Sequence, residues 1–170
     1  TKNIAEGPAR TREQAIRSIE IGIEIAEENV RKGYKVFSIG EMGISNTTSS
    51  ACILGTFNHW NAIEVTGRGT NISDERLVHK VEVVQKAMDV NHPDPKDGLD
   101  VLAKVGGFEF GCLTGVILGA AAHHAMTIID GFNTTASAFI AKSLAPQVSD
   151  YLMASHLSLE QAHKKSLAAL

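Results

Sequence analysis

A glycine-rich run with a single carboxylate is the segment of this sequence best suited to chemistry. Residues 40–48 contain Gly40, Glu41, Gly43 and Asn46. Glycines let a backbone turn tightly and approach a ligand closely, and a helix that begins at such a turn offers free N–H groups to an anion. A phosphate would repel Glu41, so we expect this carboxylate to face a sugar hydroxyl or a cationic ring. The run predicts a site for a phosphate-bearing ligand; a tight turn without a ligand is the alternative.

A strand and a helix should position this run. Residues 34–37 are rich in β-branched and aromatic types, which predicts a buried strand over 34–39. Asn46, Thr47 and Thr48 are suitable N-cap residues for a helix over 48–57. Helical spacing and capping residues predict further helices over 11–33, 73–88, 99–105, 108–124, 134–144 and 158–170. Further strands are predicted over 62–66, 126–130 and 151–155.

The alternation of strands and helices predicts the fold class. We expect residues 1–170 to form a single α/β domain, with a mainly parallel sheet and helices on both faces in a Rossmann-like three-layer arrangement. Ligands of such sheets bind at the carboxyl ends of strands. Four expected strand ends carry glycine or short polar residues: 40–43, 67–69, 130–131 and 155–156.

A glycine stripe is the main packing signal. Gly111, Gly115 and Gly119 recur every four residues, which predicts one helix face that a neighbouring backbone can approach closely. Cys52 and Cys112 lie in apolar helical runs and are expected to be buried free thiols of a reducing compartment.

Composition argues against several classes of partner. The formal net charge is −3 without a basic patch, so we expect no nucleic-acid partner. The apolar run at 116–122 is too short for a membrane span and no signal peptide is evident, which favours a soluble cytoplasmic protein. No histidine pair has zinc-ligand spacing, so we expect neither a metal nor a cofactor, and His59, His79, His92 and His163 are expected in solvent.

Several segments together resemble one enzyme family. The run Gly-Glu-Met-Gly-Ile-Ser-Asn-Thr-Thr at 40–48 resembles a signature of the nicotinate-nucleotide:dimethylbenzimidazole phosphoribosyltransferases, and residues 3–9, 94–108, 130–132 and 155–156 resemble that family in the same order. The resemblance implies transfer of phosphoribose from nicotinate mononucleotide to 5,6-dimethylbenzimidazole. The products would be nicotinate and α-ribazole 5'-phosphate, the nucleotide of the lower ligand of cobalamin.

The resemblance also implies roles for individual residues. Glu41 would lie beside the ribose or the leaving pyridine as an electrostatic catalytic group, and Lys80 matches a family lysine that contacts the phosphate; on pattern alone Lys80 would be a surface residue. Ser158 would contact the phosphate, although capping of the following helix is enough to explain it. The other residues implied in substrate binding are Gly40, Met42, Gly43, Asn46, Gly67, Gly69, Asp130 and Ser155.

The chain also departs from the family. Members are about twice as long; their Pro-Pro-Gly-Ser-Leu-Gly segment and their Gly-Glu-Gly-(Thr/Ser)-Gly segment, which carries the general base, have no counterpart here. The resemblance therefore implies a fragment of the nucleotide-binding core, inactive or nearly so by itself, from an enzyme that forms homodimers. A non-catalytic module that binds a mononucleotide or phosphate is the alternative.

Overall fold

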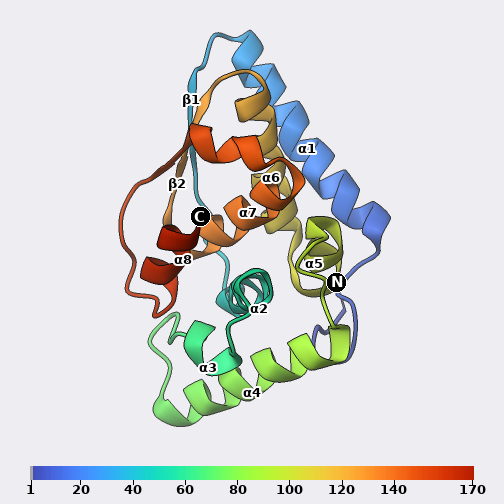
Figure 1. Cartoon of the computed structure of the whole chain (residues 1–170), viewed down its shortest axis with the longest axis vertical. Helices are drawn as coiled ribbons and strands as arrows, with labels where there is room; N and C mark the ends of the chain where they lie inside the picture. The colour runs from blue at the N-terminus through green and yellow to red at the C-terminus, as the bar shows by residue number, and fades with distance from the viewer. Residues whose placement is uncertain (1) are drawn as a thin grey trace.

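The computed structural model describes residues 2–170, which form helices around a small sheet (Figure 1). The helices and strands, in chain order, are α1 (Arg12–Arg31), β1 (Val36–Ile39), α2 (Thr47–Asn58), α3 (Ala62–Val65), α4 (Asp74–Asn91), α5 (Gly98–Val105), α6 (Phe108–Ala122), β2 (Met126–Ile129), α7 (Gly131–Leu144), the 3₁₀ helix η1 (Pro146–Tyr151), β3 (Leu152–Ala154) and α8 (His163–Ala169).

The three strands form a parallel sheet in the order β1-β2-β3. Val36 pairs with Met126 and Ile129 pairs with Ala154, so the carboxyl ends of all three strands lie at one edge. Helices α2 to α6 connect β1 to β2, and α7 with η1 connects β2 to β3. The predicted α/β class, its parallel sheet and the strands near 34–39, 126–130 and 151–155 are confirmed.

The two faces of the sheet differ in burial. Ile39 and Ile129 are buried against α6 and α7, whereas Val36, Met126 and Met153 on the opposite face are 55%, 37% and 49% exposed. Right-handed crossovers that continue in one direction put their helices on the same face of a sheet. In residues 2–170, therefore, the helices cover one face only, unlike the expected cover on both (Figure 1).

The segment predicted as a strand over 62–66 is a short helix, so that prediction is wrong. Asn61 caps α3 by accepting from the backbone N–H of Glu64, and Glu64 in turn accepts from the backbone N–H of Asn61. This capping box satisfies two free donors at once, and it outweighs the strand preference of Ile63 and Val65.

Helix boundaries follow their caps. Thr11 and Gln14 form the predicted capping box of α1, and Ser73 caps α4. Helix α7 begins at Gly131, earlier than expected, and α8 begins only at His163, not at 158. The predicted helices over 48–57, 99–105 and 108–124 are present as α2, α5 and α6.

The glycine stripe of α6 is packed against α1. A Cβ at Gly115 would overlap the carbonyl oxygen of Ile19, and a Cβ at Gly22 of α1 would overlap that of Cys112. The two backbones are therefore in direct contact, which confirms the predicted close packing. Helix α1 of the same chain covers this glycine face of α6, so the face is not free to pair with a second copy.

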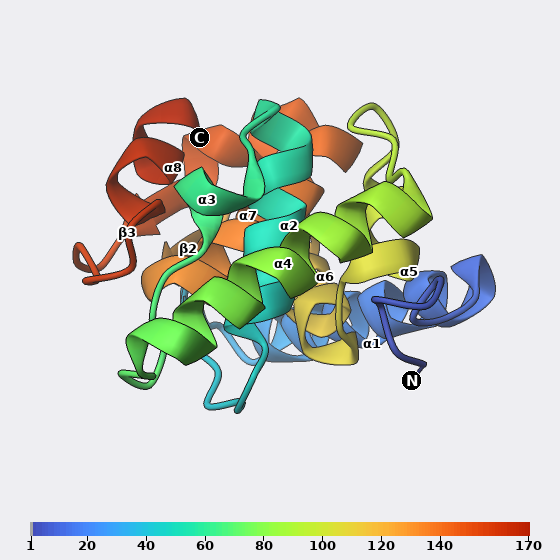
Figure 2. The ribbon, with the colours of Figure 1, turned by 90° about the horizontal axis from the view of Figure 1, so that it is seen from below.

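Helix α2 forms the centre of the larger core. Its Ile53 and Leu54 are fully buried, and α3, α4, α5 and α7 contact it (Figure 2). Cys52 is buried and free, and burial raises the pKa of its thiol to about 12, whereas Cys112 is only partly buried. In the described part of the chain, no helix is long and apolar enough to cross a membrane.

Candidate functional site

Two carboxamides hold Glu41 in place just after β1. Oε2 of Glu41 accepts from the backbone N–H of Gly43 at 2.7 Å and from the side chain of Asn46. Oε1 accepts from Nδ2 of Asn133 on α7, and this same amide also donates to Oδ1 of Asn46 at 3.1 Å. Ser50 on α2 fixes Asn133 in turn by donating to its Oδ1 at 2.6 Å. The carboxylate is thus oriented by three donors, two from the glycine-rich run and one from α7.

The hydrogen bonds from Gly43, Asn46 and Asn133 to Glu41 form a clamp. This clamp explains why asparagine and glycine occupy two positions of the glycine-rich run. Asn46 precedes α2, but its side chain makes no capping bond because it is engaged with Glu41. A Cβ at Gly43 would overlap the Asn46 amide and lie 2.9 Å from Oε2 of Glu41, so only glycine leaves room for the clamp. Met42, by contrast, is fully exposed at the tip of the loop.

Lys80 is half-buried and faces inward from α4. Its Nζ donates to Oγ1 of Thr47 and to the carbonyl oxygen of Gly67, both at 2.9 Å. A Cβ at Gly69 would lie 3.5 Å from this Nζ. Burial lowers the pKa of the Lys80 ammonium, and the negative charge of Glu160 partly opposes that shift. The structure therefore brings Gly67, Gly69 and Lys80 together.

A cavity of about 260 Å³ lies between this lysine and the glycine-rich run. Gly43, Asn46 and Thr47 line it on one side and Gly69, Lys80 and Glu160 on the other, together with Arg68 and five further residues. Its volume is close to the lower end of the usual range for small-molecule pockets. An ammonium group beside glycine backbone is suited to an anion such as phosphate.

A second polar group lies at the ends of β2 and β3. Oδ1 of Asp130 accepts from the Ser155 hydroxyl at 2.9 Å and lies 3.1 Å from Nδ1 of His156. A Cβ at Gly40 would be in ordinary contact with Asp130, at 3.8 Å. The ends of the three strands thus converge as predicted, although the Gly67–Gly69 segment reaches the site from a loop after α3 and not from a strand.

His163 is 1% exposed, so the prediction that it lies in solvent is wrong; His59, His79 and His92 are exposed as expected. Nδ1 of His163 accepts from the backbone N–H of Ser158 at 2.8 Å, which leaves the proton on Nε2, 3.1 Å from Oγ1 of Thr135. Burial lowers the pKa of the imidazole, and the charge of His156 lowers it further.

This imidazole anchors the loop before α8. Ser158 is held by His163 and does not cap α8, whose N-cap is Ala162. The hydroxyl of Thr135, which contacts Nε2 of His163, donates in turn to the carbonyl oxygen of Gly131 at 2.8 Å, beside Asp130. His163 therefore links the Ser158 loop to the end of β2.

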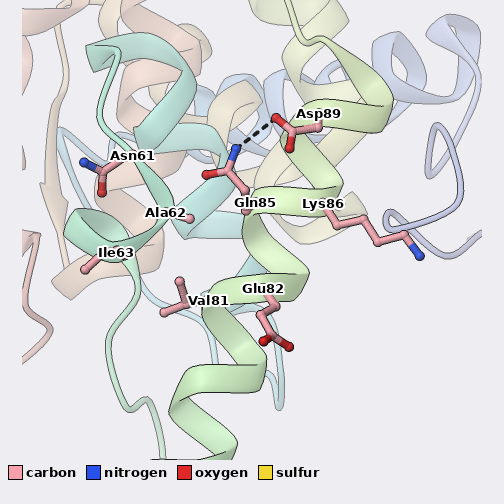
Figure 3. Close-up of a pocket in the computed structure, with 8 residues that line it drawn as sticks. All are labelled: Asn61, Ala62, Ile63, Val81, Glu82, Gln85, Lys86 and Asp89. Atoms are coloured by element: carbon pink, nitrogen blue, oxygen red, sulfur yellow. Dashed lines mark hydrogen bonds between the residues drawn. The ribbon is translucent and has the colours of Figure 1, made fainter.

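Other features of the described residues lie outside this site. No group of three or more histidine, cysteine or acidic side chains in residues 2–170 is placed to hold a metal ion. A hollow of about 490 Å³ lies between α3 and α4, where Val81 faces Ala62 and Ile63, and Lys86 extends away from them (Figure 3). None of the predicted site residues lines it.

Asn133 and Glu160 belong to the site although no sequence pattern predicted them as site residues, and His156 joins them from the predicted strand end at 155–156. Asn133 follows the Asp130-Gly131 pair by one turn of helix, so its place just after a predicted strand end was a usable signal. Glu160 had no such signal, because only folding brings it against the Gly67–Gly69 segment, 91 positions away.

The fold and the site define an α/β protein with a charged, glycine-lined cavity beside the carboxyl ends of its parallel strands. A family model described as phosphoribosyltransferase matches residues 1–170, and the chain belongs to that family.

Relatives of known identity have a more specific name. The chain is 50% identical to a nicotinate-nucleotide–dimethylbenzimidazole phosphoribosyltransferase from Clostridioides difficile (strain 630) and 54% identical to one from Syntrophotalea carbinolica, over 100% of this chain and 49% and 48% of theirs. The chain thus spans about half the length of the curated relatives it matches.

Solved structures agree. Two crystal structures of proteins from Thermus thermophilus superpose on 99% of this chain. One, of a protein of the same enzyme name, has a TM-score of 0.91, 35% sequence identity and 49% of its own chain covered. The other, of CobT, has a TM-score of 0.94, 37% identity and 50% covered.

Proposed function

We propose that this chain forms the nucleotide half of the active site of a nicotinate-nucleotide:dimethylbenzimidazole phosphoribosyltransferase. The observation that carries the proposal is a cavity lined by Lys80, Gly69 and Asn46, in a chain that belongs to the family. Asn46 also donates to the carboxylate of Glu41, which places that charge next to the cavity. The substrates would be nicotinate mononucleotide and an aromatic base such as 5,6-dimethylbenzimidazole.

The phosphate of the nucleotide would bind beside Lys80. Two of the three ammonium hydrogens are used by Thr47 and Gly67, which aims the group and leaves one hydrogen for a phosphate oxygen. Gly43 and Gly69 let the backbone approach the ligand closely. Ser158, Asp130 and Ser155 would complete the nucleotide site from the ends of β2 and β3.

Glu41 would stabilise the positive charge that develops as nicotinate leaves. The pyridinium is a good leaving group, so the enzyme needs mainly to orient the ribose and to place a fixed negative charge near the oxocarbenium-like centre. Asn46 and Asn133 fix that charge before the substrate binds. A proton must also leave the attacking benzimidazole, and we assign that general base to the half of the relatives' length that this chain does not match.

The chain matches about half the length of its relatives, so the remaining half can complete both the fold and the assembly. We propose that further segments of the whole protein cover the exposed sheet face of Val36, Met126 and Met153, which would complete the three layers. We also retain a homodimer without nucleic acid as a proposal, its contact lying elsewhere than the covered glycine face of α6. The two free cysteines favour the reducing cytoplasm as its compartment.

The test is a transfer assay on two proteins. The 170-residue chain, incubated with nicotinate mononucleotide and dimethylbenzimidazole, should release no nicotinate above background, since loss of a general base typically costs on the order of 10² to 10⁴ in rate. The same chain within the full-length protein should release nicotinate and form α-ribazole 5'-phosphate. Nucleotide binding without any transfer by the full-length protein would instead support a non-catalytic binding module.

A further inference from the structure

Glu160 places a carboxylate on the loop where the phosphate is proposed to bind. It lies between β3 and α8, and its Oε1 accepts from the backbone N–H of Gly69 at 2.9 Å. Oε2 lies against Gly67, where a Cβ would overlap it. Gly69 has a φ of +56°, a conformation that residues with a side chain rarely adopt, so this loop is built from glycine to present its N–H to an acceptor.

Lys80 faces the same cavity. Lys80 donates to the carbonyl oxygen of Gly67, and both Lys80 and Glu160 line the cavity of about 260 Å³. The remaining charged group on its wall is Arg68, which is paired with Asp74. Among residues 2–170 that line the cavity, Glu160 is therefore the anion that faces the Lys80 ammonium. Its charge opposes the lowering of the Lys80 pKa by burial.

Only one of the two carboxylate oxygens of Glu160 has a hydrogen-bond donor among residues 2–170. Its Oε2 is buried and has no hydrogen-bond partner among residues 2–170. A buried carboxylate oxygen without a donor costs free energy, because water is lost and nothing replaces it. Such a side chain is held less firmly than its single good hydrogen bond suggests, and an anion with more acceptor atoms can compete for the same donors.

We propose that Glu160 is an internal stand-in for the phosphate of the nucleotide: in the unliganded chain its carboxylate occupies the Gly69 N–H and balances the Lys80 charge, and the incoming phosphate displaces it. The inference rests on the proposed function, because it takes the Lys80 cavity to be the phosphate subsite. It makes Glu160 an affinity-determining residue, since every ligand must remove a resident negative charge before it binds.

The test compares three forms of the chain by calorimetric titration with inorganic phosphate and with nicotinate mononucleotide. Glu160→Gln keeps an acceptor for Gly69 but removes the charge, so the dissociation constants for both ligands should fall about threefold to tenfold. Glu75→Gln, which neutralises an exposed carboxylate on α4, should leave both constants unchanged. An unchanged or weakened affinity in Glu160→Gln overturns the inference.

A second measurement uses the unaltered chain. In an amide spectrum recorded during phosphate titration, the Gly69 resonance should move among the most, because its N–H changes partner. A Gly69 amide that stays fixed while Thr47 responds also overturns the inference. A different result would refute the proposed function and leave the role of Glu160 intact. In that case Glu160→Gln would strengthen phosphate binding, but nicotinate mononucleotide would bind no better than inorganic phosphate.

Discussion

Asn133, on the first turn of α7, donates a hydrogen bond to Oε1 of Glu41, a residue that lies 92 positions earlier in the chain. The contact joins the end of β1 to the start of the helix that follows β2, two neighbouring strands of the sheet. It fixes the direction of the only carboxylate in the glycine-rich run, and it makes the proposed electrostatic role of Glu41 depend on a residue outside that run.

Asn133→Ala should lower the turnover of the full-length protein about tenfold to a hundredfold, because small errors in the placement of a catalytic charge are costly. The Michaelis constant for the nucleotide should change much less. Steady-state kinetics checks both values. Asn58→Ala is the matched control, since the side chain of Asn58 on α2 donates to the carbonyl oxygen of Leu54, away from the site, and should tolerate the change. Equal losses in the two variants would contradict the assigned role.

Glu41→Gln retains the shape of the side chain and removes its charge. We expect turnover in the full-length protein to fall by more than nucleotide affinity does, the pattern of an interaction that is stronger in the transition state than in the ground state. Kinetics combined with a direct binding measurement separates the two effects. Undiminished turnover would leave Glu41 as a turn residue.

Lys80→Ala should raise the Michaelis constant for nicotinate mononucleotide about tenfold or more, since a charged hydrogen bond contributes roughly 1.5–3 kcal/mol. The constant for dimethylbenzimidazole should stay nearly unchanged. Lys86→Ala, on the same helix but extending away from the core, is the matched control (Figure 3). A nucleotide constant that is equally insensitive to both changes removes Lys80 from the site.

Local sequence signals predicted most of the elements. The capping residues Thr11 and Ser73 mark the starts of α1 and α4, and Gly111, Gly115 and Gly119 mark the face of α6 that α1 contacts. The capping signals act over a few neighbouring residues. The glycine repeat is informative because glycine at every fourth position of a helix lets a second backbone approach closely. The parallel pairing was also predictable, because helices separate each strand from the next along the chain.

The misses arise where two local signals compete or where distant residues meet. At Ala62–Val65, β-branched side chains favour a strand, but the Asn61–Glu64 capping box decides for a helix. His163 looks like a surface residue in a polar segment, yet the fold supplies Ser158 and Thr135 as partners for both ring nitrogens. Asn133 and Glu160 became site residues through contacts with residues 92 and 91 positions away, which no local pattern encodes.

The stability of the chain should depend on the protonation of His163. Burial lowers its folded pKa below the ordinary value of 6.5, so the unfolded chain binds the proton more readily than the folded chain does. The His163 contribution is therefore fully present above pH 6.5 and declines as the pH falls from there toward the folded pKa. Urea midpoints measured between pH 8 and 5 should decline less in His163→Gln than in the unaltered chain.

His92→Gln is the control for that series, because His92 is exposed on the C-terminal side of α4. Its midpoints should follow those of the unaltered chain at every pH. If His163→Gln and the unaltered chain lose stability in parallel, the buried imidazole is not the group that titrates.

A crystal structure of the chain with nicotinate mononucleotide tests the central claim most directly. A phosphate oxygen should lie within hydrogen-bond distance of Nζ of Lys80, in the cavity bordered by Gly43 and Gly69, and the ribose and the pyridinium ring should lie toward Glu41. A nucleotide bound in the hollow between α3 and α4, or a phosphate bound elsewhere while Lys80 keeps only Thr47 and Gly67 as partners, would contradict it.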